Sequence, residues 1–296
     1  LSGSNAKLLS RELGTVLTGR HVDVTVYPLS FSEFLSFKSA DLSSGRLGGY
    51  LREYLEKGSF PALVVSGVGI QEWLISYYDD LLEKDLIRRF KIRKTEELKS
   101  LLRFYMGNIA KPTTFHSAAK FLGLSPSTTE KFMAYFEQAY LLFPLQRFSS
   151  GFKGQMKSPR KIYTIDTALA RAVGFRVGDD FGRMAENIVY IELLRTKMYY
   201  PEREYFYWKD ERVGRDGSEV DFVVKNGSKI LEIVQVCMGD FSGDVRKREL
   251  RAIRKAVARL NPEKITVITE DLASVESFPY GTVEFISLEK WLLRLQ

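Results

Sequence analysis

One stretch of the sequence, Glu219 to Cys237, constrains the fold more than any other. It consists of two apolar runs, rich in β-branched residues, on either side of Asn226-Gly227. Asn-Gly between two such runs predicts a β-hairpin, because both central residues of a type I′ turn need a positive φ. Asp221 therefore lies on one predicted strand, and Glu232 and Gln235 lie on the other.

Asp221 is an acidic residue inside an apolar strand. Burying a charge costs free energy unless the group is paired, and a carboxylate facing oxygen atoms on the next strand is also how a Mg²⁺ site is built. In a simple two-residue hairpin Asp221 lies opposite Glu232, and Gln235 faces the other way. A β-bulge would instead bring Gln235 opposite Asp221. Both pairings stay open at this stage.

Composition narrows the class of protein. The net charge of +7 permits a polyanionic partner such as DNA without demanding one. Cys237 is the one cysteine, so an intramolecular disulfide and a zinc cluster are both excluded, which fits a reducing cytoplasm. No apolar run approaches the roughly 20 residues of a membrane span, and the first residues lack a secretory signal pattern. We therefore expect a cytoplasmic protein that does not enter a membrane.

The first 150 residues are predicted to be mostly helical. The spacing of apolar residues predicts helices over 6–17, 47–55 and 70–86, a strand over 21–26, and a short helix from Phe31 capped by Ser30 or Ser32. Three further helices and a strand over 142–148 are typical of a winged helix-turn-helix. These helices cover 96–106, 114–121 and a segment opened by a Ser127–Glu130 capping box. On that last helix Thr128, Thr129, Lys131 and Gln138 are predicted to face outward, and Lys131 is a candidate nucleic-acid contact.

Beyond residue 150, predicted strands and helices alternate, which indicates an α/β domain around a mixed sheet. The basic segment 151–161 contains no acid and is predicted to be a flexible loop. Besides the hairpin we expect strands over 162–166, 205–208, 264–269 and 283–286, and helices over 184–197, 245–260 and 288–295. The helix over 245–260 is amphipathic, and its basic stripe is either a phosphate-contacting surface or an ordinary solvated face. That stripe consists of Arg248, Arg251, Lys255 and Arg259.

In order and content, these motifs resemble a family of archaeal and bacterial AAA-type ATPases that carry a C-terminal winged helix and a PD-(D/E)XK nuclease-like domain. The matching segments are Ser2-Gly3-Ser4-Asn5, Gly19-Arg20, Pro28 to Leu35, Gly58-Ser59-Phe60-Pro61 and the hairpin. The resemblance implies four parts. They are the end of an ATPase core (1–37), a helical lid-like segment (38–94), a winged helix-turn-helix (95–150) and a restriction-endonuclease-like α/β domain with a mixed sheet (151–296).

The resemblance assigns nucleotide-sensing roles near the start of the chain. Ser4 or Asn5 would contact the γ-phosphate or the attacking water, and Arg20 would be a candidate arginine finger. No Gly-x-x-x-x-Gly-Lys-Ser/Thr motif occurs in the sequence, so this chain by itself is not expected to bind ATP tightly. We expect no cofactor in the isolated chain, whereas ATP and Mg²⁺ are implied for the full-length family, with the Walker motifs upstream.

For the nuclease-like site, the resemblance implies a constellation of Glu186, Asp221 and Gln235, with Asp221 as metal ligand. The family's acid-x-Lys falls on Gln235-Val236-Cys237, where an amide and a thiol stand instead. An amide lacks the charge that Mg²⁺ demands, and no lysine takes the third place. We therefore expect a DNA- or protein-binding module with an inactive or severely weakened nuclease-like domain. A Mg²⁺-dependent DNA nuclease and a pure protein-interaction module are the alternatives.

Overall fold

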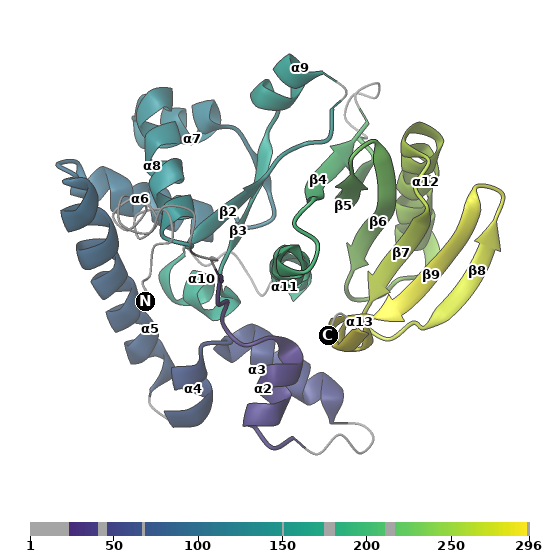
Figure 1. Cartoon of the computed structure of the whole chain (residues 1–296), viewed down its shortest axis with the longest axis horizontal. Helices are drawn as coiled ribbons and strands as arrows, with labels where there is room; N and C mark the ends of the chain where they lie inside the picture. Colours follow the sequence, from purple (N-terminus) through teal and green to yellow (C-terminus); the bar gives the residue numbers. More distant parts are fainter. Residues whose placement is uncertain are drawn as a thin grey trace. The chain divides into compact units, whose positions relative to one another are not determined.

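The structure is a computed structural model that describes residues 24–40, 46–66, 69–149, 151–174, 181–210 and 217–294. The chain divides into two compact units, and it passes between them several times (Figure 1). The first unit comprises residues 1–41, 52–144 and 162–178, and the second comprises 42–51, 145–161 and 179–296. The boundaries predicted near residues 37, 94 and 150 stay predictions.

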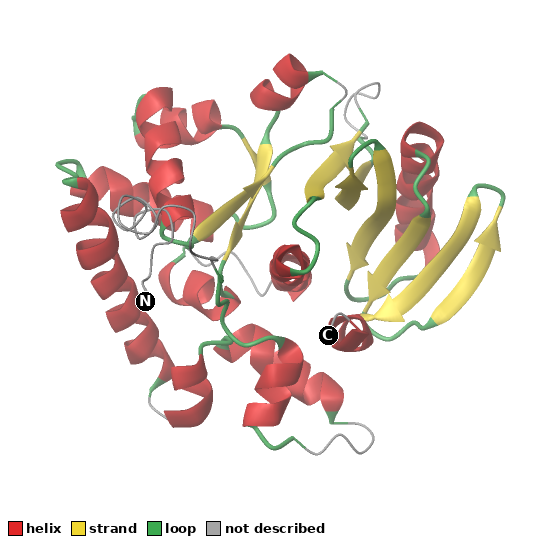
Figure 2. Cartoon of the chain, in the orientation of Figure 1, coloured by secondary structure: helices red, strands yellow, loops and turns green. Residues whose placement is uncertain are grey.

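The first unit is mainly helical, as Figure 2 shows by colour. A three-stranded sheet of order β1-β3-β2 accompanies its helices, with β1 at Pro112–Thr113, β2 at Leu142–Leu145 and β3 at Arg160–Thr164. The last residue of β2 and the first two of β3 are counted with the second unit. Its helical elements are α2 (Phe31–Phe37), α3 (Leu47–Lys57, begun in the second unit), α4 (Pro61–Ser66), α5 (Ile70–Asp80), the π-helix η1 (Leu81–Arg88), α6 (Thr95–Met106), α7 (Phe115–Leu122), α8 (Pro126–Gln138) and α10 (Thr167–Val173).

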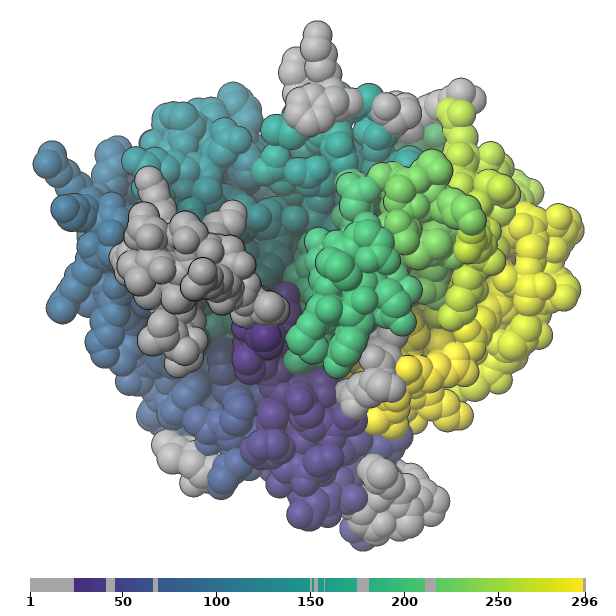
Figure 3. Space-filling model, in the orientation of Figure 1, coloured from purple at the N-terminus to yellow at the C-terminus, as the bar shows by residue number. Residues whose placement is uncertain are grey.

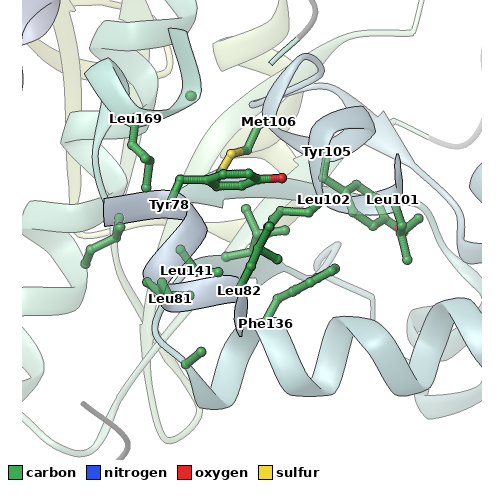
Figure 4. Close-up of a cluster of buried hydrophobic side chains, with 14 of the residues drawn as sticks. Tyr78, Leu81, Leu82, Leu101, Leu102, Tyr105, Met106, Phe136, Leu141 and Leu169 are labelled. Atoms are coloured by element: carbon green, nitrogen blue, oxygen red, sulfur yellow. The ribbon is translucent and has the colours of Figure 1, made fainter. Parts of the chain in front are cut away.

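The core of the first unit forms where η1, α6 and α8 meet. Leu98, Leu101, Leu102 and Tyr105 of α6 are spaced at three and four residues, so they share one buried face. Figure 4 shows these helices contributing side chains to one cluster. At about 25 cal/mol per Å² of apolar surface, such burial is the main stabilising contribution to this unit.

Local cap chemistry accounts for the ends of α8 and α2. Ser125, and not the predicted Ser127, caps α8, because Pro126 takes the first helical position where a missing N–H costs nothing. The Ser125 hydroxyl accepts from the Thr128 N–H at 3.1 Å. Thr129, predicted to face outward, is buried, and its hydroxyl donates to the Ser125 carbonyl. Ser30 caps α2 in a capping box with Glu33, which decides between the two predicted caps.

A buried carboxylate ties two distant segments of the first unit together. Asp166 caps α10, and its carboxylate accepts from the Ser59 N–H at 2.7 Å and the Ser59 hydroxyl at 2.8 Å. Gly58, which precedes Ser59, has a φ of +87°, and a Cβ at this position would lie 2.7 Å from Asp166 Oδ1. The Gly-Ser-Phe-Pro segment is therefore held by backbone geometry that only glycine adopts readily.

The second unit is built on a six-stranded mixed sheet, which confirms the α/β class predicted for this part of the chain. The strand order is β4-β5-β6-β7-β9-β8. Neighbours pair antiparallel from β4 to β6 and between β8 and β9, whereas β6-β7 and β7-β9 are parallel. Its strands are β4 (Arg203–Lys209), β5 (Glu219–Asn226), β6 (Lys229–Cys237), β7 (Lys264–Thr269), β8 (Ser274–Phe278) and β9 (Gly281–Ser287).

Helices cover both faces of this sheet (Figure 1). Tyr190 of α11 (Phe181–Arg195) stacks on Phe222, with ring centroids 5.9 Å apart. On the other face, Ile253 of α12 (Gly243–Leu260) joins a cluster that contains Val223 and Ile233. The remaining helical elements are α9 (Phe152–Lys157), η2 (Thr196–Met198) and α13 (Leu288–Arg294). Successive residues of β5 thus point to opposite helices, as the period of two requires.

Several expectations need correction here. The segment 151–161 is not a flexible loop, because it contains α9 and the start of β3. The β8–β9 hairpin lies at one edge of the sheet, yellow in Figures 1 and 3, and its first strand was not expected. The described end of the predicted strand over 21–26 has no strand partner assigned, and Val26 is 88% exposed. The predicted helix over 6–17 lies outside the described residues.

Candidate functional site around Asp221

A β-bulge decides what lies opposite Asp221. Val224 pairs with Glu232, but Lys225 pairs with Ile230, so β6 carries one extra residue. The register beyond the bulge brings Asp221 beside Gln235. The Asp221 N–H donates to Gln235 Oε1 at 3.1 Å. The expected pairing of Asp221 with Glu232 is therefore wrong, for two reasons. Asn226 pairs with Lys229, so the two-residue turn is Gly227-Ser228 and lies one residue later than expected, and the bulge adds one further residue to β6.

Glu232 takes part in a different set of contacts. It accepts a hydrogen bond from the Thr266 hydroxyl, and it lies 3.2 Å from Lys264 Nζ. Lys264 also contacts Glu284, which pairs with Arg294. Glu232 is thus one member of a chain of ion pairs across β6, β7 and β9, and it does not join Asp221.

The sequence reasoning missed the residue at the centre of the site, which is Lys161. Its Nζ lies 2.7 Å from Asp221 Oδ1, 2.8 Å from Glu219 Oε1 and 2.9 Å from Glu186 Oε1. The Lys161 side chain is 2% exposed. All four residues belong to the second unit. The available signal was a lysine directly before the apolar run Ile162 to Ile165, a position where a strand residue is buried.

The charges at this centre stabilise one another. Burial by itself would lower the pKa of Lys161, but Asp221, Glu186 and Glu219 together raise it well above its ordinary value. Burial would likewise raise the pKa of Glu219, yet Lys161 and then Lys209 hold it below its ordinary value. Lys161 is therefore an ammonium ion at physiological pH, and Glu219 is a carboxylate.

Helix α12 contributes a further carboxylate, Glu249, to the site. The Gln235 Nε2 donates to Glu249 Oε2 at 3.0 Å, so the amide bridges Asp221 and this second helix-borne carboxylate. Burial raises the pKa of Glu249, the ion pair with Arg248 opposes this, and the charge of Asp221 adds to it. Glu249 follows Arg248 of the predicted basic stripe in the sequence. Its helical phase instead places it inward, with Ala252 and Ile253.

An open pocket of about 190 Å³ lies between β5, β6 and α12. Gly217, Ser218, Glu219, Asp221, Gln235, Arg248, Glu249, Arg251 and Ala252 line it. The pocket combines carboxylates with two guanidinium groups, so it is neither strongly acidic nor strongly basic. Within the described part of the chain, no group of three or more His, Cys, Asp or Glu side chains is arranged to hold a metal ion.

The predicted basic stripe on α12 divides into two kinds of residue. Arg248 pairs with Glu249 at 2.7 Å, and Lys255 pairs with Asp210 at 3.6 Å. Arg251 lines the pocket and is exposed, as is Arg259 further along the helix. Of the other predicted residues, Lys131 is exposed on α8 in the first unit, with Nζ 5.9 Å from the Tyr135 ring.

The residues predicted to sense nucleotide, Ser4, Asn5 and Arg20, lie outside the described residues. Within the described ranges, no helix is long and apolar enough to cross a membrane.

Comparison with known proteins relates the start of this chain to AAA-type ATPases. Residues 1–35 match a family model described as an AAA domain. Residues 48–179 and 181–291 match two models described as domains of unknown function, DUF8612 and DUF4143. The boundary between these two matches lies near residue 179, where the last and longest segment of the second unit begins. The relation to AAA-type ATPases thus rests on the N-terminal segment.

Two curated relatives are described as uncharacterized proteins. One, from Haemophilus influenzae, is 32% identical over 240 residues, which cover 79% of this chain and 57% of the relative. The other, from Methanocaldococcus jannaschii, is 29% identical and covers 99% of this chain and 68% of the relative. The chain therefore spans only part of the length of both relatives.

One solved structure is also similar to part of the chain. It is a half-complex from a tetradecameric assembly of Thermococcus gammatolerans McrB AAA+ hexamers with bound McrC. The similarity covers 68% of this chain and 52% of that chain, at 16% identity and a TM-score of 0.30. A score of this size does not establish a shared fold.

Proposed function

We propose that this chain is part of an AAA-type ATPase, and that its second unit is a nuclease-like module that binds DNA without cutting it. The observation that carries this proposal is the position of Lys161. Its ammonium group occupies the point on which three carboxylates converge, with N–O distances of 2.7 to 2.9 Å. A divalent cation bound by these three carboxylates would have to occupy the same position, and the Lys161 ammonium already compensates part of their negative charge.

The placement of the predicted site residues supports the nuclease-like assignment. Glu186 comes from the helix before the sheet, Asp221 from β5, and Gln235 from the adjacent β6. This is the distribution that the family resemblance implies. In the first unit, α6, α7 and α8 followed by β2 agree with the proposed winged helix-turn-helix. Both assignments are part of the proposal.

The charge balance argues against cleavage. The site holds four carboxylates, which are Glu186, Glu219, Asp221 and Glu249. Three cations contact them: Lys161 in the centre, Lys209 on Glu219, and Arg248 on Glu249. Mg²⁺ prefers anionic oxygen ligands that keep their charge available. Here most of that charge is compensated, and Gln235 contributes an amide.

Exposed cations on α12 support DNA as the partner. Lys247, Arg251, Arg254 and Arg259 are exposed along one 18-residue helix. Cations that follow a helix can contact successive phosphates, and each contact makes binding weaker as salt rises. Because the overall charge is +7, the long-range field also favours a polyanion.

The test is fluorescence anisotropy of a labelled duplex against salt, with and without Mg²⁺, followed by a gel of the same samples. We expect salt-sensitive binding with the DNA left whole. The variant Arg251→Ala/Arg254→Ala should bind more weakly and reduce the salt slope by about two. Lys229→Ala/Lys290→Ala removes the same charge from exposed positions elsewhere in the unit and is the matched control. An equal loss of DNA affinity in both variants would show that the α12 arginines act only through the net charge of the protein.

A Mg²⁺-dependent DNA nuclease is the second candidate, and one observation favours it. Lys161 supplies a lysine beside Asp221, although it comes from a different strand than the resemblance implies. DNA cleavage that requires Mg²⁺ and disappears in Asp221→Asn would replace the non-cutting proposal. If the duplex is not bound even at low salt, the partner is a protein.

A further inference from the structure

A second surface of the second unit exposes aromatic side chains. Met198 at the end of η2, and Tyr199 and Tyr200 in the turn that leads to β4, are 57%, 69% and 44% exposed. The segment around residue 200, green in Figure 3, lies at the surface that faces the viewer. Three consecutive large apolar residues exposed together mark a binding surface more often than a scattered single residue does.

The turn is ordered by its own hydrogen bonds. The Tyr199 and Tyr200 N–H groups both donate to the Thr196 carbonyl, at 3.0 and 2.9 Å, and the Arg203 N–H donates to the Tyr200 carbonyl at 3.1 Å. The Thr196 hydroxyl in turn contacts the buried Tyr205 hydroxyl at 2.7 Å. The aromatic residues are therefore presented on a fixed backbone, which lowers the entropy cost of binding a ligand.

One cation lies directly beside an exposed ring, and a second lies over the buried Tyr205 ring. The Arg203 guanidinium is 3.7 Å from the centre of the Tyr200 ring, and Lys197 Nζ is 5.5 Å from the Tyr205 ring. Of the two acids in this segment, Glu204 pairs with Lys225, whereas Glu202 contacts the neutral Asn226 amide at 3.4 Å and keeps its charge. The surface thus combines exposed aromatic rings, a guanidinium group, a second cation and one carboxylate.

We propose that this turn, Lys197 to Arg203, is a stacking site for unpaired bases of single-stranded nucleic acid. Aromatic rings and guanidinium planes receive bases irrespective of sequence, because every base has a π-face, while adjacent cations contact the phosphates. An acidic peptide would contact the cations and leave the ring faces without a matching partner. This site lies apart from α12 in sequence and from the residues that line the Asp221 pocket, and it does not depend on the proposed binding of duplex DNA.

The experiment measures anisotropy of a labelled oligo-dT strand with Tyr199→Ala/Tyr200→Ala. Stacking on each ring predicts a loss in affinity of about 10-fold per tyrosine, with the salt slope unchanged because no cation is removed. The variant Tyr199→Phe/Tyr200→Phe keeps both rings and should bind as the original protein does. Val275→Ala, at a residue 70% exposed on β8 of the same unit, is the matched control.

Three outcomes would overturn the proposal. They are absence of oligo-dT binding by the original protein at low salt, unchanged affinity in the double Ala variant, and an equal loss in the double Phe variant. Loss of duplex binding in the Arg251→Ala/Arg254→Ala protein tests the α12 proposal alone. The two proposals therefore fail separately.

Discussion

Replacing Lys161 with methionine tests the account of the Asp221 site most directly. Methionine has a similar length and flexibility, so the packing volume changes little while the charge is lost. The change leaves Glu186, Glu219 and Asp221 without the ammonium that each contacts within 2.9 Å. Removing one partner of a buried ion pair leaves an uncompensated buried charge, which is the costly case.

The magnitude follows from the burial of the partners. Removing one partner of a fully buried pair costs about 3–5 kcal/mol. The Lys161 and Asp221 side chains are 2% and 9% exposed, but Glu219 is 23% exposed and keeps Lys209 as a second partner. We therefore expect the lower end, about 3 kcal/mol. For a unit of this size that corresponds to a drop in Tm of roughly 6–12 °C.

The pH dependence gives a second check. The pKa of Glu219 is held below its ordinary value in the folded protein, so its stabilising contribution is present above the unfolded pKa and is lost as pH falls through the folded pKa. The pKa of Lys161 is raised, so its contribution persists until strongly alkaline pH. The difference in unfolding free energy between the two proteins should be largest near neutral pH and should shrink on acidification below about pH 4.5.

Urea unfolding at several pH values measures this difference. The control is Lys225→Met, which removes a lysine paired with Glu204, where the side chains are 26% and 51% exposed. Exposed pairs contribute about 1 kcal/mol or less. A loss below about 1 kcal/mol for Lys161→Met, or a loss that does not change with pH, would refute the reasoning.

The other predictions concern single positions in the two units. Gly58→Ala should cost far more than Gly227→Ala, because both have a positive φ but only the first Cβ meets neighbouring atoms within 4 Å; comparable losses in thermal unfolding would contradict this. Asp166→Asn should lower the free energy of unfolding by about 2 kcal/mol, because both carboxylate oxygens accept hydrogen bonds and an amide offers one acceptor. An unchanged urea midpoint would contradict a stabilising role for these hydrogen bonds. Gln235→Glu adds a fifth carboxylate to the site, so Tm should fall without metal, and millimolar Mn²⁺ should raise it in the variant and not in the original protein. A metal-independent Tm in the variant would show that the added charge creates no cation site.

Much of the local structure follows from the sequence because its causes are local. The two apolar runs around Asn226-Gly227 were sufficient to predict the β5–β6 hairpin, but the turn itself is Gly227-Ser228, because Asn226 is the last residue of β5 and pairs with Lys229. The predicted cap of α8, Ser127, lies two residues after the actual cap, Ser125, because Pro126 occupies the first helical position. The sequence pattern thus predicts that a helix is present more reliably than it predicts the residue at which the helix begins.

What the sequence by itself determined was the α/β class of the second unit, the hairpin, and the presence of Asp221 and Gln235 on adjacent strands. These depend on periodicity and turn chemistry, which act over a few residues. Only the tertiary structure decided that a bulge joins Asp221 to Gln235, that Glu249 faces inward, and that Lys161, 60 residues before Asp221 in the chain, lies at the centre. The physical reason is that burying several carboxylates requires a compensating cation, and the sequence does not indicate which distant lysine meets that requirement until the strands are placed together.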